Sequence, residues 1–179
     1  MSICARQSAL PLAFMSTVSE IPLVLKPATA ADFEFTHDLT RANMEDYVKR
    51  HWGEWSREVY TENYHNGRNL IVWEADTRVG YARVLPQPPV LVLDDLQIIA
   101  ARQRRGFGTY VIEYLYGTLA WFECTHLRLR VFHENPALRL YLRTGFREVQ
   151  RHEGTSILER GATDEALTSG AACGETTAV

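Results

Sequence analysis

The sequence has little that would mark a secreted, membrane-bound or metal-dependent protein. Its 179 residues include three cysteines, Cys4, Cys124 and Cys173. They are odd in number and far apart, which predicts a reducing compartment and no disulfide framework. No apolar run reaches the about 18 residues that span a bilayer, and no histidine or cysteine cluster has the spacing of metal ligands. We therefore expect a cytoplasmic protein with no metal and no membrane partner.

A strong excess of charge is also missing. The sequence has 19 Lys and Arg against 22 Asp and Glu, and a net charge of −3 gives no overall attraction for nucleic acid. With 46% hydrophobic residues, the chain has the composition of a globular protein and the length of one domain. We expect a single domain over residues 23–160, a disordered extension at 1–22 and a disordered tail at 161–179.

Apolar periodicity and turn residues predict an α/β protein. Strands are expected at 21–25, on both sides of Asp76, and at 90–99, 126–132, 147–151 and 156–160. Helices are expected from Thr29, the first residue of a capping box, through Met44, and at 56–64, 108–122 and between Asn135 and Gly145. This order predicts a mixed sheet with helices on both faces.

The stretch ARQRRGFGTY, residues 101–110, concentrates positive charge and glycine in an otherwise mildly acidic chain. It follows an expected strand and opens an expected helix, whose first N–H groups are unpaired and carry the positive end of the helix dipole. Gly106 and Gly108 allow a close backbone approach, and Arg104 and Arg105 add donors for phosphate. The segment is either a phosphate-binding loop or an ordinary solvated loop.

Two common nucleotide-binding loops are excluded by what this stretch lacks. A Walker loop requires a lysine, and the dinucleotide-binding fingerprint requires a third glycine where Val111 stands. The remaining pattern, Gln103-x-x-Gly106-x-Gly108, resembles the pyrophosphate-binding motif of the GCN5-related N-acetyltransferases (GNAT), which bind acetyl-CoA. Downstream, NPALRLYLRTGF resembles a second motif of that family, and the resemblance covers about residues 23–160. RANMEDYVKRHWGEW is similar to a bacterial GNAT subgroup of unassigned substrate.

The resemblance implies a central, mostly antiparallel, twisted sheet of about six or seven strands that splays at the strand ending near Ile98. It also implies that main-chain groups of this strand bind the pantetheine arm and that the following loop binds the pyrophosphate, with Gln103 orienting the loop. Asn135, expected first as a helix N-cap, would also contact the pantetheine arm. The implied coenzyme-binding residues are Ile98, Ile99, Ala100, Gln103, Arg104, Arg105, Gly106, Phe107, Gly108, Thr109, Asn135 and Tyr141.

Three residues are candidates for proton transfer. Tyr141 matches the general acid of the family, although a tyrosine among leucines also suits a core position. Asp94 and Asp95 lie in one expected strand, whose period of two directs them to opposite faces. One of them, with its pKa raised by burial, would act as a base through water. The alternatives are a solvated or loop-capping carboxylate and a base-free mechanism with ordered water.

Tyr47, Trp52 and Trp55 lie in the segment that borders the acceptor pocket in the family, and the alternative is an aromatic lid on the core. Acidic neighbours such as Asp46 and Glu54 favour a cationic acceptor. We therefore predict an N-acetyltransferase that moves the acetyl group of acetyl-CoA directly to a small-molecule or protein amine. The alternatives are an idle acyl-CoA-binding domain and, less favoured, a nucleotide-binding interaction module. The resemblance also allows a homodimer.

Overall fold

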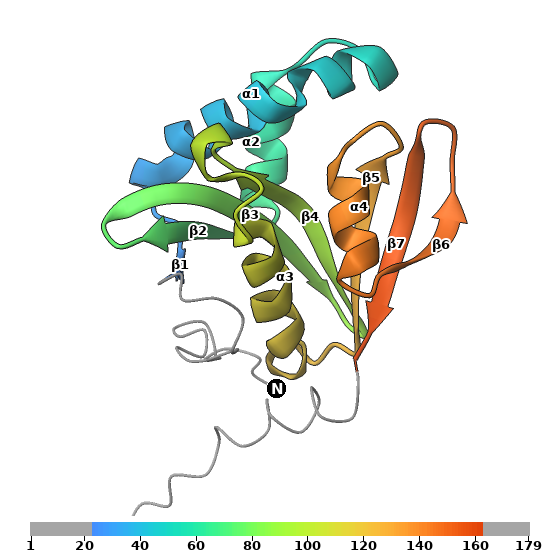
Figure 1. Cartoon of the computed structure of the whole chain (residues 1–179). Coiled ribbons are helices and arrows are strands. Elements are labelled where there is room, and N and C mark those ends of the chain that lie inside the picture. Colours follow the sequence, from blue (N-terminus) through green and yellow to red (C-terminus); the bar gives the residue numbers. More distant parts are fainter. Residues whose placement is uncertain (1–22, 163–179) are drawn as a thin grey trace, which may run out of the picture.

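Seven strands form one open sheet with the order β1-β2-β3-β4-β5-β7-β6 (Figure 1). The computed structural model describes residues 23–162. Every neighbouring pair is antiparallel except β4 and β5, which are parallel. The strands are β1 (Leu23–Pro27), β2 (Arg68–Glu74), β3 (Thr77–Gln87), β4 (Val90–Ile98), β5 (His126–Phe132), β6 (Arg147–Arg151) and β7 (Thr155–Gly161). The mostly antiparallel sheet expected from the sequence is confirmed.

The expected extension at 1–22 and most of the expected tail lie outside the described residues. Gly161, which the sequence analysis assigned to the tail, is the last residue of β7. Its neighbour Ala162 donates its N–H to the carbonyl of Thr125 at 2.6 Å. Within the described part of the chain, no helix is long and apolar enough to cross a membrane.

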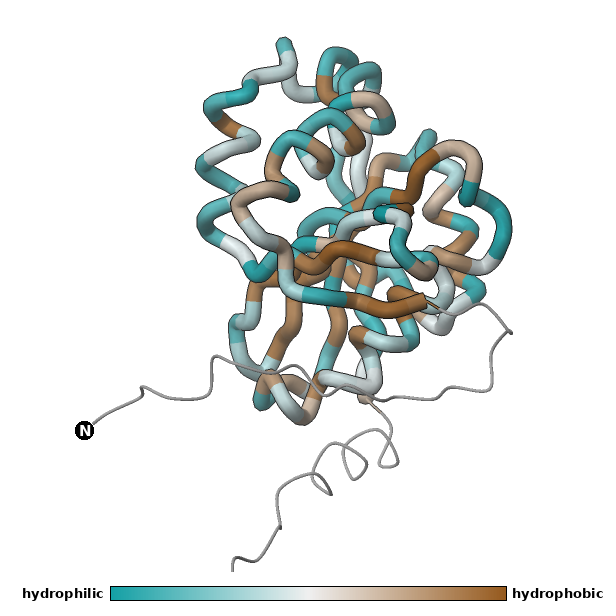
Figure 2. Tube along the Cα trace, turned by 90° about the vertical axis from the view of Figure 1, so that its left-hand side faces the viewer, coloured by the Kyte–Doolittle hydropathy of each residue, from teal (hydrophilic) through white to brown (hydrophobic). Residues whose placement is uncertain are grey.

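Helices cover both faces of the sheet, as expected (Figure 1). They are α1 (Phe33–His51), α2 (Arg57–His65), α3 (Phe107–Gly117) and α4 (Ala137–Arg143). The helices α1 and α2 pack on one face through Leu39, Tyr60 and Tyr64, which meet Ile71 and Tyr81 of the sheet. The larger core, on the other face, includes the buried side chains of α3 and α4. Figure 2 shows hydrophobic residues concentrated in the central strands, whereas hydrophobic and hydrophilic residues alternate along the helices.

Local signals explain most of the helix ends. The expected capping box is present, because the N–H of Thr29 donates to Asp32 at 2.8 Å. The helix α1 runs seven residues beyond Met44, to His51. By contrast, α3 ends at Gly117 rather than Phe122. The hydroxyl of Thr118 donates to the carbonyl of Leu115 at 2.8 Å, and the chain then forms a separate 3-10 turn.

The pairing between β4 and β5 stops halfway along both strands. It joins Val90–Leu93 to His126–Leu129, and beyond these residues β4 pairs with β3 and β5 with β7. The two strands therefore diverge, which confirms the splay expected from the sequence. Since each strand still carries main-chain N–H and C=O groups along the gap, the divergence creates a site that is polar at its walls.

The large core predicts the stability effect of shortening a helix residue. Leu115 of α3 is fully buried against the sheet. We expect Leu115→Ala to lower the free energy of unfolding by about 2–5 kcal/mol, because it leaves a cavity in a packed interior. Val24→Ala, at a side chain that is 41% exposed, is the control and should change it little. Urea unfolding of both variants checks this; equal effects would contradict the assignment of the core.

Candidate active site

A single large cleft opens where β4 and β5 diverge. Its volume is about 1390 Å³, and its walls come from both sides of the sheet. The coenzyme-motif residues Gly106 and Gly108 line it together with Asp95 and Tyr141. The sheet splay thus brings together the loop and the proton-transfer candidates that lie far apart in the sequence.

The loop between β4 and α3 has the geometry of an anion cradle. Gly106 adopts a left-handed φ of 87° immediately before α3, and Arg104 adopts 59°, which is unusual for a residue with a side chain. The first helical N–H bond runs from Tyr110 to the carbonyl of Gly106, at 2.9 Å. The N–H groups of the preceding residues, Phe107 to Thr109, have no acceptor within the helix and are available to an anion.

Two contacts fix this cradle in place. The amide of Gln103 donates to the carbonyl of Ile98 at 3.0 Å, which ties the loop to the end of β4. At Gly108, a Cβ atom would lie 2.9 Å from Cδ2 of Leu140, so the helix start packs tightly on α4. A side chain at position 108 would require the end of the Leu140 side chain to move.

The structure divides the sequence-predicted coenzyme residues into two groups. Lining the cleft are Ile98, Gln103, Arg104, Gly106, Gly108, Thr109, Asn135 and Tyr141; outside the lining are Ile99, Ala100, Arg105 and Phe107. Phe107 is 1% exposed and its ring belongs to the core. Ile99 donates its N–H to Val79 and accepts from Arg102, so both its main-chain groups are already engaged.

Asn135 stands just before α4. Its side-chain oxygen accepts the N–H of Ala137 at 2.9 Å, so it supplies a capping bond for the helix start. The helix begins at Ala137, one residue after the expected first position, Pro136. This helix places Tyr141 in the cleft wall.

A β-bulge places both acidic residues of β4 in the cleft. In the pairing with β3, Val84 lies opposite Leu93 and Arg83 opposite Asp95, so Asp94 is an additional residue in β4. Simple alternation had directed the two carboxylates to opposite faces, but the bulge brings both to the lining. Arg83 holds Asp94 by a bond of 2.6 Å from Nε to Oδ2.

Asp95 is enclosed by hydrogen-bond donors. It accepts from Gln97 Nε2 at 2.7 Å and from Thr40 Oγ1 at 3.1 Å. Burial raises the pKa of Asp95, whereas the charge of Arg83 and the bond from Gln97 oppose that shift. A carboxylate whose pKa is raised by its surroundings is better suited to accept a proton than a solvated one.

Tyr141 is 8% exposed and lies where the core meets the cleft. It belongs to the core, where its ring meets Phe146 at 5.8 Å, and it also lines the cleft. Burial raises the pKa of its phenol, and the charge of Asp95 adds to the rise. The phenol is therefore protonated at neutral pH and able to donate.

Aromatic side chains at the end of α1 form the opposite wall. The rings of Tyr47 and Trp52 lie 5.6 and 4.6 Å from the ring of Phe132 in β5. Trp52 is 59% exposed at the mouth of the cleft, whereas Trp55 lines the cleft and also packs against Tyr60. The segment therefore packs partly on the core, as the aromatic-lid alternative expected, and partly lines the cleft, while its contact with an acceptor stays a prediction.

Sequence reasoning missed four side chains that shape the site: Thr40, Arg83, Gln97 and Phe132. Their elements were expected, but each side chain gains its role from a neighbouring strand or helix. Two of them could have been found from the sequence, because Arg83 and Gln97 are polar residues that interrupt the apolar runs of β3 and β4.

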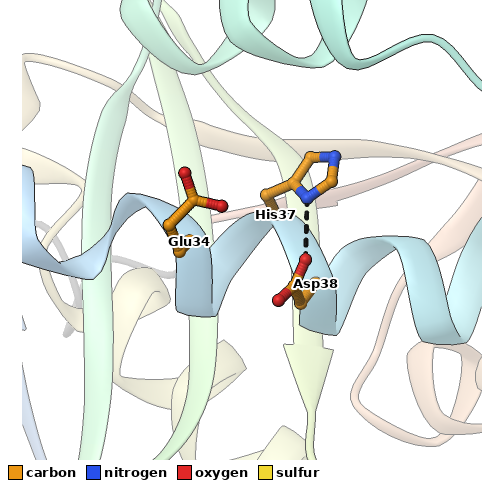
Figure 3. Close-up of side chains that lie close together, drawn as sticks. All are labelled: Glu34, His37 and Asp38. Atoms are coloured by element: carbon orange, nitrogen blue, oxygen red, sulfur yellow. Dashed lines mark hydrogen bonds and ion pairs between the residues drawn. The ribbon is translucent and has the colours of Figure 1, made fainter.

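A separate cluster has the composition of a metal site. Glu34, His37 and Asp38 lie close together on α1, with Nδ1 of His37 2.9 Å from Asp38 (Figure 3). The guanidinium of Arg57 bonds to Glu34 and lies 3.3 Å from Nδ1 of His37. This side chain already supplies a positive charge, and the cluster is not part of the cleft lining.

Comparisons with known proteins agree with this architecture. The acetyltransferase (GNAT) family profile matches residues 34–146, and the chain belongs to this family. A comparison with curated protein sequences gave no match.

Solved structures show the same fold. The ribosomal-protein-S18-alanine N-acetyltransferase from Escherichia coli has 19% identity and a TM-score of 0.58, covering 79% of this chain and 94% of its own. A GNAT acetyltransferase from Elizabethkingia anophelis with acetyl-CoA bound has 14% identity, a TM-score of 0.62 and coverages of 78% and 97%. The PaiA N-acetyltransferase from Thermoplasma acidophilum, in complex with coenzyme A, has 14% identity, a TM-score of 0.61 and coverages of 78% and 98%.

The raised pKa of Asp95 predicts a pH-dependent stability. The unfolded chain loses this proton near the ordinary value of 3.8, whereas the folded protein retains it to higher pH. The contribution of Asp95 to the unfolding free energy therefore falls as pH rises through that interval, and Asp95→Asn removes this contribution. We expect the variant to gain stability relative to the unchanged protein between acid and neutral pH. Urea unfolding across this pH range measures the difference in unfolding free energy between the variant and the unchanged protein, with Asp76→Asn, at an exposed residue, as control. A difference that moves against the variant as pH rises would contradict a raised pKa for Asp95.

Proposed function

We propose that this protein transfers the acetyl group of acetyl-CoA to an amine by direct attack while both substrates are bound. One observation carries the proposal: the cleft at the β4–β5 divergence is lined at once by the start of α3, by Asp95 and by Tyr141. Family membership and structural neighbours that hold acetyl-CoA or coenzyme A support the same donor.

The residues present fit this donor. The free N–H groups at the start of α3 and the guanidinium of Arg104 suit the pyrophosphate. Main-chain groups of β4 along the gap suit the pantetheine arm, which bonds well to a strand edge. An N–H of this strand would also stabilise the negative charge that develops on the thioester oxygen.

Two side chains supply the proton transfers. As the amine nitrogen bonds to the thioester carbon, it gives up a proton, which Asp95 accepts directly or through a water. When the carbon–sulfur bond breaks, the electron pair stays on sulfur, and the phenol of Tyr141 donates a proton to form the free thiol. An acceptor that arrives as a cation first releases one proton to water, since only the neutral amine can attack. The products are an acetylated amine and coenzyme A, and transfer of the proton from Asp95 to the Tyr141 phenolate through water restores both side chains.

The acceptor is an amine of a small molecule or of a protein. Asp46 and Glu54 line the cleft beside the aromatic wall of Tyr47 and Trp52, which favours an acceptor that arrives as a cation. The general base would be Asp95 rather than Asp94, because Asp94 is held in an ion pair by Arg83, whereas burial raises the pKa of Asp95.

The test combines calorimetry with acetyl-CoA and a thiol-release assay over a panel of polyamines, amino acids, aminoglycosides and peptides. We expect binding and thiol release that depends on at least one amine. Binding without release by any amine would instead indicate an idle acyl-CoA-binding domain. If acetyl-CoA does not bind at all, the proposal fails.

Tyr141→Phe tests the acid. We expect kcat to fall by about 100-fold, since the departing thiolate loses its proton donor, while the Kd for acetyl-CoA changes little. Tyr64→Phe is the matched control, a buried tyrosine of α2 outside the cleft lining. Steady-state kinetics and calorimetry give both quantities. An unchanged kcat for Tyr141→Phe would remove this residue as the acid.

A further inference from the structure

Basic side chains line the whole cleft, whereas its acidic side chains are confined to one part of it. The acidic lining residues are Asp46, Glu54, Asp94 and Asp95, which come from α1, the segment after it and β4. The end formed by the entry to α3 and by α4 carries Arg104, Arg139 and Arg143, and no acidic residue lines it. This end is therefore positive in a protein whose net charge is −3.

Arg139 and Arg143 are exposed, and neither forms an ion pair with any residue that the structure describes. Three other arginines of the cleft are paired, Arg50 with Glu134, Arg83 with Asp94 and Arg128 with Glu159. Arg104 and Arg130 also line the cleft without an ion pair to a described residue, but they lie outside α4. Arg139 and Arg143 stand four residues apart in α4, so their guanidinium groups lie on one face of the helix.

This face adjoins the cradle. Leu140, the residue after Arg139, lies against Gly108, where a Cβ would come within 2.9 Å of its side chain. The arginines of α4 line the same cleft as the start of α3 and add positive charge beyond its free N–H groups. The arrangement offers two adjacent places for phosphate, one at the helix start and one at the arginine pair.

Coenzyme A carries phosphate in two places, the pyrophosphate and the 3′-phosphate of the ribose. We propose that Arg139 and Arg143 bind the 3′-phosphate, while the start of α3 and Arg104 bind the pyrophosphate. Arginine suits this task because its planar group pairs with two phosphate oxygens at once. This inference rests on the proposed function.

The consequence is selection of the donor. Thioesters on a carrier-protein phosphopantetheine share the arm of coenzyme A but lack the 3′-phosphate. An enzyme that binds the 3′-phosphate therefore discriminates between coenzyme A thioesters and carrier-protein thioesters. The α4 arginines would therefore restrict the reaction to free coenzyme A thioesters.

The test compares acetyl-CoA with 3′-dephospho-acetyl-CoA by calorimetry. In the unchanged protein, we expect acetyl-CoA to bind about 10- to 100-fold more tightly, the difference made by charge-assisted hydrogen bonds. In the double variant Arg139→Gln with Arg143→Gln, this preference should largely disappear. The affinity for the dephospho compound should stay as it was.

The charge-matched control is Arg147→Gln with Arg151→Gln, at exposed residues of β6 that do not line the cleft. It should keep the full preference. A preference retained by the α4 variant, or an equal loss of affinity for both compounds, would overturn the 3′-phosphate assignment while leaving the proposed function intact. If the unchanged protein binds neither compound, both the proposed function and the assignment fall.

Discussion

The site depends on the point at which two parallel strands stop pairing. After Leu93 and Leu129, β4 and β5 separate, and each keeps its bonds to the strand on its far side. The sheet thus remains continuous at one end and open at the other. Unpaired strand edges are costly unless water or a ligand satisfies them, and the cleft of about 1390 Å³ gives a ligand access to these edges. The coenzyme cradle and the proton-transfer residues acquire a common location only because of this gap.

The β-bulge in β4 adds a second constraint. One additional residue, Asp94, turns the strand so that two neighbouring carboxylates face the same cleft. Arg83 neutralises Asp94, while Asp95 remains in a setting where burial raises its pKa. Two adjacent, chemically identical side chains therefore have different surroundings, and under the proposed function only Asp95 takes part in proton transfer. Tyr141 faces them from the opposite side of the gap, and its phenol stays neutral for the complementary role.

Much of this arrangement was predictable from local signals. The glycines of residues 101–110 predicted the strand-to-helix junction, and Asn135 and Gly145 predicted the short helix that carries Tyr141. The bulge was not predictable, because the sequence VLVLDDLQI of β4 does not identify the additional residue, and only the register with β3 shows it. The same is true of Phe132, because its place in the site depends on the rings of Tyr47 and His51 in α1 and of Trp52 just after it. Contacts between distant elements thus account for the part of the site that sequence patterns missed.

The central claim is that the gap between β4 and β5 is the binding site for acetyl-CoA, with the start of α3 holding its phosphates. Backbone amide chemical shifts, measured by NMR before and after saturation with acetyl-CoA, test it most directly. The account predicts large shifts at Phe107, Gly108 and Thr109 and along β4 from Asp95 to Ile98, and small shifts along β1 and β6 at the sheet edges. Binding that leaves the amides of α3 and β4 unchanged, or that shifts mainly another surface, would contradict it.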